Sequence, residues 1–229
     1  MENKKFFLLA ASLALIFTSV QLSGQEESRD VSGFTSISYA LPGSLEIVQG
    51  SSESLVLKGN QDDLDKIITK VEGGTLKIYT KPHVSNLSHI TVYVTVRNLE
   101  ELDVAGSGDV NVKDVLKSDD FELTLSGSGD VMFNKLEASS LEISLAGSGD
   151  ISIAGKVKEV EISIAGSGDI KADELESENA EVSIAGSGSA RVWATESLET
   201  SIVGSGDVYY KGNPLVEADV VGSGSTKTL

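Results

Sequence analysis

The sequence has 229 residues and a formal net charge of −17 at pH 7. It offers no basic stripe that could neutralise phosphates, which argues against a nucleic-acid partner, and its charge disfavours anionic membrane surfaces. Because 40% of the residues are hydrophobic, the chain has enough aliphatic side chains for a sizeable core, which argues against disorder.

The first 24 residues have the pattern of a secretory signal peptide. Lys4 and Lys5 precede a mostly apolar run from Phe6 to Val20, and Gly24 supplies a small residue for cleavage. The run is too short for a comfortable membrane span, and no second long apolar run follows it. The sequence contains no cysteine for lipid attachment or disulfides. We expect an exported protein, periplasmic or extracellular, that is not a lipoprotein and has no membrane span in its mature chain.

Residues 31–104 predict a β-rich portion that is continuous with the repeats that follow it. Alternating apolar and polar residues mark strands at Phe34–Tyr39 and Leu45–Val48, and again at Thr75–Thr80 and Ile90–Val96. Glycine, proline and serine between these runs supply the turns.

This N-terminal portion also predicts one helix, from Asn60 to Val71. Asn60 can cap the first turn, and the apolar residues from Leu64 onward follow the i, i+3, i+4, i+7 spacing of one helical face. Gly73 and Gly74 would then end the helix.

Residues 105–229 contain a repeat. A Gly-Ser-Gly break, usually followed by Asp, occurs seven times, and its copies start 18 to 21 residues apart. A break at such a period indicates a repeat architecture. The glycines that we expect at these structural turns are Gly106 and Gly108, Gly127 and Gly129, Gly147 and Gly149, Gly166 and Gly168, Gly186 and Gly188, Gly204 and Gly206, and Gly222 and Gly224.

The segments between the breaks alternate with period 2, which is typical of strands. Leu141, Ile143 and Leu145 share one face, and Ile151 and Ile153 resume that face after the break. A coil of this length cannot bury its inward side chains alone, so neighbouring coils must stack. The sequence therefore predicts an all-β fold, a single-stranded parallel β-helix (β-solenoid) with one short helix near its N-terminus. Parallel crossovers favour the right-handed form.

The chain also resembles a known family. The segment Gly33–Ile37, the predicted helix, the run Thr75–Ile78 and the Gly-Ser-Gly-Asp series are similar to the bacterial domain family of unknown function described as “putative auto-transporter adhesin, head GIN domain”. The resemblance covers about Val31 to Thr228. It implies an exported envelope protein with a β-helical body, and it brings no catalytic residues.

The Gly-Ser-Gly-Asp turns have two interpretations. Their glycines allow positive φ angles, and the Asp side chains can accept hydrogen bonds from turn amides. Alternatively, carboxylates stacked about 4.8 Å apart could bind calcium between coils. The repeat lacks the nonapeptide of calcium β-rolls, so we expect no cofactor and keep calcium as the alternative. The candidate metal ligands are Asp109, Asp130, Asp150 and Asp169.

A column of exposed residues just after the breaks is the candidate ligand-binding surface. It includes Lys171, Arg191 and Tyr209, and Trp193 lies two positions beyond Arg191. Aromatic rings on a solenoid face can stack on sugars, which suits a polysaccharide or peptide ligand. The alternative is a mixed, solvated strand face with incidental aromatic residues.

Catalysis has little support in the sequence. The two histidines, His83 and His89, both lie outside the repeats, and the lysines and arginines after the breaks stand two to six residues past them, with no single position common to all. We therefore expect a non-enzymatic binding, adhesin-like or structural envelope protein, whose ligand is a cell-surface polysaccharide or an envelope protein. A polysaccharide lyase or hydrolase on the same scaffold is the alternative, and it would need acids converging beside a cation in a cleft.

The last predicted coil, Val220 to Leu229, has no helix or loop to cover it. Unpaired backbone groups at such an end favour pairing with another strand. End-to-end self-association is therefore a further expectation.

Overall fold

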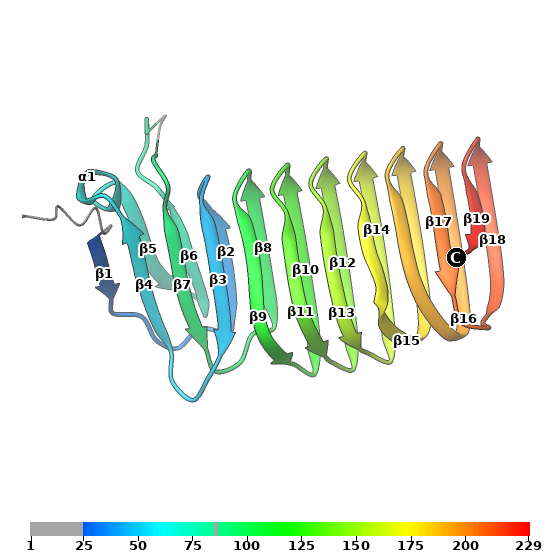
Figure 1. Cartoon of the computed structure of the whole chain (residues 1–229), viewed down its shortest axis with the longest axis horizontal. Helices are drawn as coiled ribbons and strands as arrows, with labels where there is room; N and C mark the ends of the chain where they lie inside the picture. Colours follow the sequence, from blue (N-terminus) through cyan, green and yellow to red (C-terminus); the bar gives the residue numbers. More distant parts are fainter. Residues whose placement is uncertain (1–24, 85–86) are drawn as a thin grey trace, which may run out of the picture.

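The computed structural model describes residues 25–84 and 87–229, and the predicted signal peptide, residues 1–24, lies outside the described residues. The chain forms an elongated β-solenoid of about 6 turns, with one short helix near the N-terminal end (Figure 1). This confirms the predicted all-β solenoid, while its handedness stays a prediction. None of the described helical segments has the length and apolar character needed to cross a membrane.

The described residues form nineteen strands and the helix α1 (Gln61–Leu64). The strands are β1 (Gln25–Arg29), β2 (Ser36–Ala40), β3 (Ser44–Gln49), β4 (Ser54–Gly59), β5 (Ile67–Glu72), β6 (Thr75–Thr80), β7 (Thr91–Val96), β8 (Glu101–Gly106), β9 (Asp109–Lys117), β10 (Asp120–Gly127), β11 (Val131–Glu137), β12 (Ser140–Gly147), β13 (Ile151–Lys156), β14 (Glu159–Gly166), β15 (Ile170–Gly186), β16 (Ser189–Gly204), β17 (Asp207–Lys211), β18 (Leu215–Gly222) and β19 (Ser225–Thr228).

Each turn contributes one strand to each of two facing layers (Figure 1). The first layer, here called sheet I, runs from β2 through β8, β10, β12 and β14 to the second halves of β15 and β16, and ends at β18. The second layer, sheet II, runs from β3 through β9, β11 and β13 to the first halves of β15 and β16, and ends at β17 and β19. All of these pairings are parallel, so equivalent residues of successive turns lie side by side.

The N-terminal end departs from this regular order. The coil made by β2 and β3 lies between the later strands β6 and β7 on one side and β8 and β9 on the other. Antiparallel pairs then complete this end, since β4 pairs with β7 and with β1, and β5 pairs with β6. The first coil is therefore enclosed by strands that follow it in the sequence.

The predicted helix from Asn60 to Val71 is wrong beyond its first turn. Asn60 caps α1 as expected, its side chain accepting from the Asp63 amide, but the helix ends at Leu64 and residues 67–72 form β5. Isoleucine, threonine and valine in this stretch favour a strand. Gly73 and Gly74 both have positive φ and form the two-residue turn of the β5–β6 hairpin rather than a helix stop.

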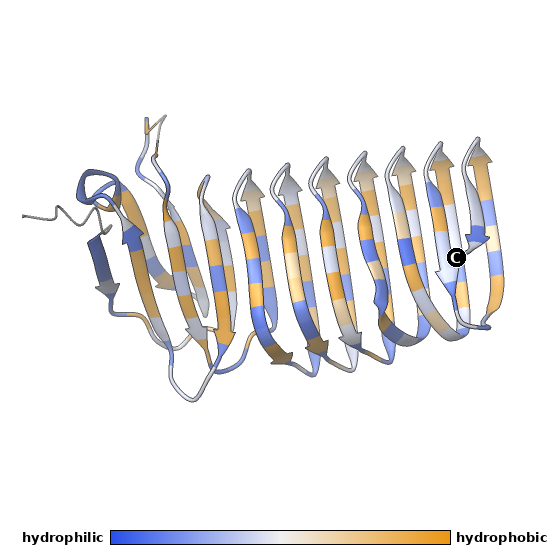
Figure 2. Ribbon diagram, in the orientation of Figure 1, coloured by the Kyte–Doolittle hydropathy of each residue, from blue (hydrophilic) through white to orange (hydrophobic). Residues whose placement is uncertain are grey.

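The core fills the space between the two sheets. The alternation of hydrophobic and hydrophilic residues is visible along every turn of the repeat (Figure 2). In one turn of the repeat, five aliphatic side chains on either side of the Gly-Ser-Gly turn, here called the elbow, are at most 2% exposed: Leu141, Ile143, Leu145, Ile151 and Ile153. Equivalent aliphatic residues of the neighbouring turns pack above and below them. Burial of these stacked side chains is the main stabilising contribution to the fold.

The Gly-Ser-Gly elbows need glycine at both positions, for different reasons. The first glycine of each elbow has positive φ, which is 139° at Gly147. The second glycine, such as Gly149, has no positive φ, but a Cβ there would overlap with the Gly129 carbonyl oxygen. The Ser148 amide donates to the Gly127 carbonyl over 2.9 Å, so the elbows of successive turns are in direct backbone contact.

Replacing an elbow glycine should cost far more stability than replacing a glycine in an open turn. For Gly147→Ala we expect the free energy of unfolding to fall by about 3 kcal/mol or more, because the conformation is strained and the added Cβ overlaps with Gly127. Gly73→Ala is the control, since Gly73 also has positive φ but has no atom within 4 Å of an added Cβ, and it should cost about 1 kcal/mol. Denaturant unfolding measures both, and equal losses would contradict the stacking argument.

Candidate functional site

The outward-facing residues of the solenoid form columns, because parallel in-register pairing places equivalent residues on neighbouring strands. Four columns of the described residues matter for the site: the aspartates at the elbows, a mixed column on sheet II, a glutamate column on sheet I, and a second column on sheet II in which lysines alternate with glutamates before Trp193 and Lys211. The chemistry available to the surface depends on which side chains each column brings together.

The elbow aspartates form a hydrogen-bonded column. The Asp130 amide donates to Asp109 Oδ1 over 3.1 Å, and the Asp150 amide donates to Asp130 Oδ1 over 3.0 Å. The Asp169 and Ser189 amides continue the series with Asp150 and Asp169 at 3.1 and 2.9 Å. Each carboxylate thus accepts from the backbone of the next turn, and does not bond within its own turn.

The second oxygens of these carboxylates face solvent or a cation. Lys171 lies 3.1 Å from Asp150 Oδ2 and neutralises part of the column. Within the described ranges, His, Cys, Asp and Glu side chains form no group of three that could hold a metal ion. Calcium binding by Asp109, Asp130, Asp150 and Asp169 stays the untested alternative to the expectation that the column binds no metal.

The mixed column on sheet II brings together three of the four predicted ligand-binding residues. Lys171, Arg191 and Tyr209 occupy the same position on successive strands, and Lys227 follows on β19. Trp193 lies two residues beyond Arg191, in the neighbouring column, where it pairs with Lys211 of β17. All of these side chains lie on the outer face of sheet II, toward the C-terminal end of the solenoid.

Cations cover the rings in this region. The Arg191 guanidinium and the Lys227 ammonium, from the strands on either side, each lie 6.0 Å from the centroid of the Tyr209 ring. The Lys211 ammonium lies 4.3 Å from the centroid of the Trp193 ring. We call these five residues the cation–ring cluster. Such contacts contribute about 0.5–1 kcal/mol at an exposed site, and they hold the cations in place.

Two carboxylates adjoin the cluster: Glu176, which is in register with Trp193 and pairs with Lys156, and Asp207. The Tyr209 hydroxyl donates to Asp207 Oδ2 over 3.2 Å, and the Lys227 ammonium is 3.8 Å from Oδ1. The Ser225 hydroxyl donates to the same carboxylate and, with the charge of Lys227, lowers the pKa of Asp207 below its ordinary value. Asp207 is therefore ionised at neutral pH and fixes the tilt of the Tyr209 ring.

Sequence reasoning missed Lys211 and Lys227 as members of this surface. Each Gly-Ser-Gly break is followed by one Asp or Ser residue, and Arg191, Tyr209 and Lys227 each stand two residues after it. Lys211 stands two residues after Tyr209, just as Trp193 stands two residues after Arg191. Counting from the elbows would have found both.

A second column that sequence reasoning missed is a glutamate ladder on sheet I. Seven glutamates pair in register on successive strands, from β8 to β18. Each stands five residues before the first glycine of its break, and this fixed spacing was the available signal. The members are Glu101, Glu122, Glu142, Glu161, Glu181, Glu199 and Glu217.

Like charges at this spacing oppose ionisation. Partial burial, followed by the charges of Glu142, Glu101 and Asp103, raises the pKa of Glu122. Burial and the charge of Glu101 likewise raise the pKa of Asp103. The raised pKa values of Glu122 and Asp103 thus lie in the N-terminal part of sheet I.

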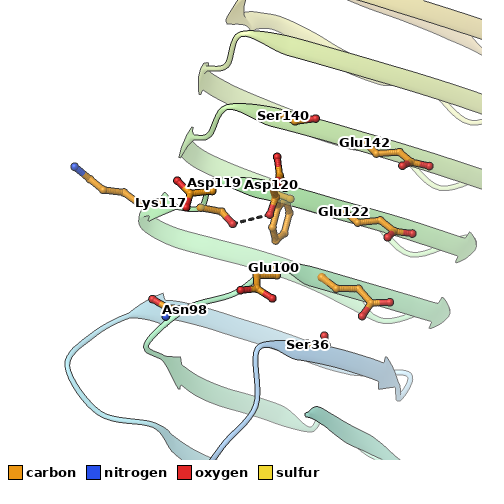
Figure 3. Close-up of a pocket in the computed structure, with 12 residues that line it drawn as sticks. Ser36, Asn98, Glu100, Lys117, Asp119, Asp120, Glu122, Ser140 and Glu142 are labelled. Carbon is orange, nitrogen blue, oxygen red and sulfur yellow. Dashed lines mark hydrogen bonds between the residues drawn. The ribbon is translucent and has the colours of Figure 1, made fainter. Parts of the chain in front are cut away.

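A cavity of about 890 Å³ adjoins this part of the ladder (Figure 3). It is lined mainly by acids and by Lys117, but Glu122 and Glu142 extend side by side in one direction and Lys117 points away from them. The Lys117 ammonium pairs with Glu137, at 3.1 Å. Glu122 and Glu142 therefore do not converge with Lys117 on a common point, as acid–base catalysis would require.

The histidines lie elsewhere. His83 and His89 are exposed residues between β6 and β7, near the N-terminal end, and His83 has a positive φ of 65°. The cation–ring cluster lies near the opposite end of the solenoid (Figure 1). The structure therefore does not bring the histidines together with the predicted ligand-binding residues.

The hydrogen bonds of the aspartate column lead to a prediction about stability. Asp150→Ala removes the acceptor of the half-buried Asp169 amide, and we expect the free energy of unfolding to fall by about 1–3 kcal/mol. Asp150→Asn keeps an oxygen acceptor and should cost less.

Thermal unfolding with calcium and with a chelator should give the same melting temperature, since backbone amides already use one oxygen of each carboxylate. A rise in the melting temperature with calcium would instead support metal binding.

The glutamate ladder generates a second prediction. At pH 7, Glu142→Gln should increase the free energy of unfolding by about 0.5 kcal/mol, because it removes repulsion with Glu122 and Glu161. A raised carboxylate pKa stabilises the fold below the unfolded-state pKa, and that contribution is lost as the pH rises through the folded-state pKa. Glu122 has such a raised pKa, so the difference between variant and wild type should shrink as the pH falls and Glu122 becomes protonated.

The matched control for this prediction is Glu159→Gln. Glu159 is exposed on the same strand as Glu161, but its in-register neighbours are Ser140 and Asn179. This substitution should leave stability at pH 7 nearly unchanged. An equal gain from both substitutions would show that net charge, and not the ladder, is responsible.

Similar folds occur among solved structures. A “putative adhesin” from Bacteroides fragilis is 24% identical, with a TM-score of 0.87 over 90% of this chain and 96% of that chain. A “putative lipid binding protein” from Parabacteroides distasonis is 27% identical, with a TM-score of 0.75 over 91% and 98%. A “putative adhesin” from Parabacteroides merdae is 23% identical, with a TM-score of 0.74 over 91% and 97%.

The comparison with curated proteins finds no match. A family model matches residues 33–214, which is most of the described chain and includes both the N-terminal coils and the repeats. The chain belongs to the family described as “Putative auto-transporter adhesin, head GIN domain”.

Proposed function

We propose that the protein is an exported, non-enzymatic, adhesin-like binding module whose ligand lies across the outer face of sheet II. The ligand is an extended chain, a cell-surface polysaccharide or an envelope protein. The cation–ring cluster is the observation that carries this proposal, because it gathers two aromatic rings and three cations in two adjacent exposed columns.

The geometry of the solenoid supports an extended ligand. Equivalent positions recur about every 4.8 Å along the axis, so a chain lying along the axis would meet one residue of each column per turn. Aromatic and arginine side chains are the residues that most often dominate binding at protein surfaces. The names of the structural neighbours from Bacteroides fragilis and Parabacteroides merdae agree with an adhesin role.

A polysaccharide lyase or hydrolase on the same scaffold is the alternative function. The acidic cavity on sheet I is the place where such chemistry would be sought. Glu122 and Glu142 extend in parallel there, while Lys117 points away from them and is paired with Glu137, which favours binding over catalysis. Shortening of a bound polysaccharide during prolonged incubation would support the enzyme.

An array of bacterial polysaccharides and envelope proteins tests the proposal. We expect the wild type to retain at least one of them, and Trp193→Ala with Tyr209→Ala to weaken that binding about tenfold or more. The control is Tyr79→Ala with Tyr93→Ala, which removes two surface tyrosines from the N-terminal coils. Unchanged binding by the Trp193 and Tyr209 variant, or equal loss in the control, would place the ligand elsewhere.

A further inference from the structure

We infer that the cation–ring cluster binds an acidic polysaccharide, through the carboxylate or sulfate groups of that chain. This inference rests on the proposed function and narrows it, because it names the feature of the ligand that the site recognises. It rests on three observations: two cations of the cluster have no carboxylate partner, cations lie over its rings, and the cations are closely spaced in an otherwise acidic protein.

The first argument is the absence of neutralising partners. Most lysines and arginines of the described chain pair with a carboxylate, as Lys156 does with Glu176 at 2.7 Å. No carboxylate of the described residues lies within 4.0 Å of the Arg191 guanidinium or the Lys211 ammonium. In a chain of net charge −17, two neighbouring cations that remain without such partners are available for an anion from outside.

The second argument concerns the rings. A neutral sugar stacks on the bare face of an aromatic ring, but Tyr209 has a cation from each neighbouring strand at 6.0 Å from its centroid. One face of Trp193 is occupied by Lys211, at 4.3 Å. The rings therefore act mainly as supports that fix the positions of the cations. Recognition by charge suits this surface better than recognition by stacking, which the sequence alone suggested.

The third argument is geometric. Arg191 and Lys227 flank Tyr209 on β16 and β19, and Lys211 follows Tyr209 by two residues on β17. Two cations thus flank the Tyr209 ring, and a third lies over the Trp193 ring of the neighbouring column, on strands about 4.8 Å apart. Anionic groups repeated along a polymer can contact several of these cations at once. Each contact raises the effective concentration of the next anionic group near the next cation.

The rest of the surface restricts where such a chain can lie. The glutamate ladder occupies the outer face of sheet I and repels polyanions, so an acidic polymer would be confined to sheet II. The cluster lies at the C-terminal end of sheet II, beyond the elbow aspartates of the middle turns. Of the two carboxylates next to the cluster, Glu176 is paired with Lys156 and Asp207 is engaged by Ser225 and Tyr209.

Binding of defined polymers tests the inference. We would measure the affinity of the protein for polygalacturonate, dextran sulfate and neutral dextran by biolayer interferometry. The wild type should bind at least one of the two acidic polymers and should not bind neutral dextran, and the comparison between the two acidic polymers separates carboxylate from sulfate recognition. Arg191→Gln with Lys211→Gln should weaken that binding about tenfold, as expected for two exposed ion pairs.

Two further variants keep the experiment specific. Lys113→Gln with Lys158→Gln changes the net charge equally but alters lysines outside the cluster, and it should bind as the wild type does. Arg191→Lys with Lys211→Arg keeps both charges and should retain most of the affinity. Loss of affinity in the control pair equal to that in the cluster pair would overturn the inference.

The outcomes also separate this inference from the proposed function. If neutral dextran or another neutral glycan binds through Trp193 and Tyr209, the module is adhesin-like but does not select acidic chains. If acidic polymers bind equally well to the Arg191→Gln and Lys211→Gln variant, their site is not the cluster. If neither the array nor the defined polymers bind, the proposed function fails together with the inference.

Discussion

The close backbone contact between successive turns is the constraint on which the structure depends. Parallel strands in register place identical positions about 4.8 Å apart, and at the elbows no side chain fits between one turn and the next. Gly127, Gly147 and Gly166 each leave room only for the carbonyl oxygen of the preceding turn. The elbows in turn fix the register of the strands on both sides, so the core columns and the surface columns all follow from them.

The same constraint has opposite effects inside and outside the solenoid. Inside, it stacks aliphatic residues such as Leu145 and Ile164 on one another, which removes apolar surface from water. Outside, it stacks Glu122 between Glu101 and Glu142, and burial together with these charges raises the pKa of Glu122. The elbow aspartates instead accept backbone amides of the next turn. On sheet II one column places Tyr209 between Arg191 and Lys227, so the two outer faces of one repeat acquire different chemistry.

The regular part of the fold could be predicted because its signals are local and periodic. Alternation over Leu141–Leu145 and the recurring glycines identify strands and turns without knowledge of distant contacts. The helix prediction failed beyond Leu64 because the apolar spacing from Leu64 to Val71 fits a helix, while the pairing of β5 with β6 that decides the outcome is a tertiary contact. The pairing of β2 with both β6 and β8 has no periodic signal at all. The members of a column could be found by counting from the elbows, but the placement of Lys211 over Trp193 depends on side-chain conformations.

The enclosed position of the first coil bears on how the chain assembles. When the chain emerges N-terminus first, β2 and β3 have partners on neither side until β6 to β9 have also appeared. The end of the solenoid must therefore form as one cooperative unit of about a hundred residues, through long loop closures that are slow. Once it exists, every later coil docks on a finished template, and folding becomes sequential growth in one direction.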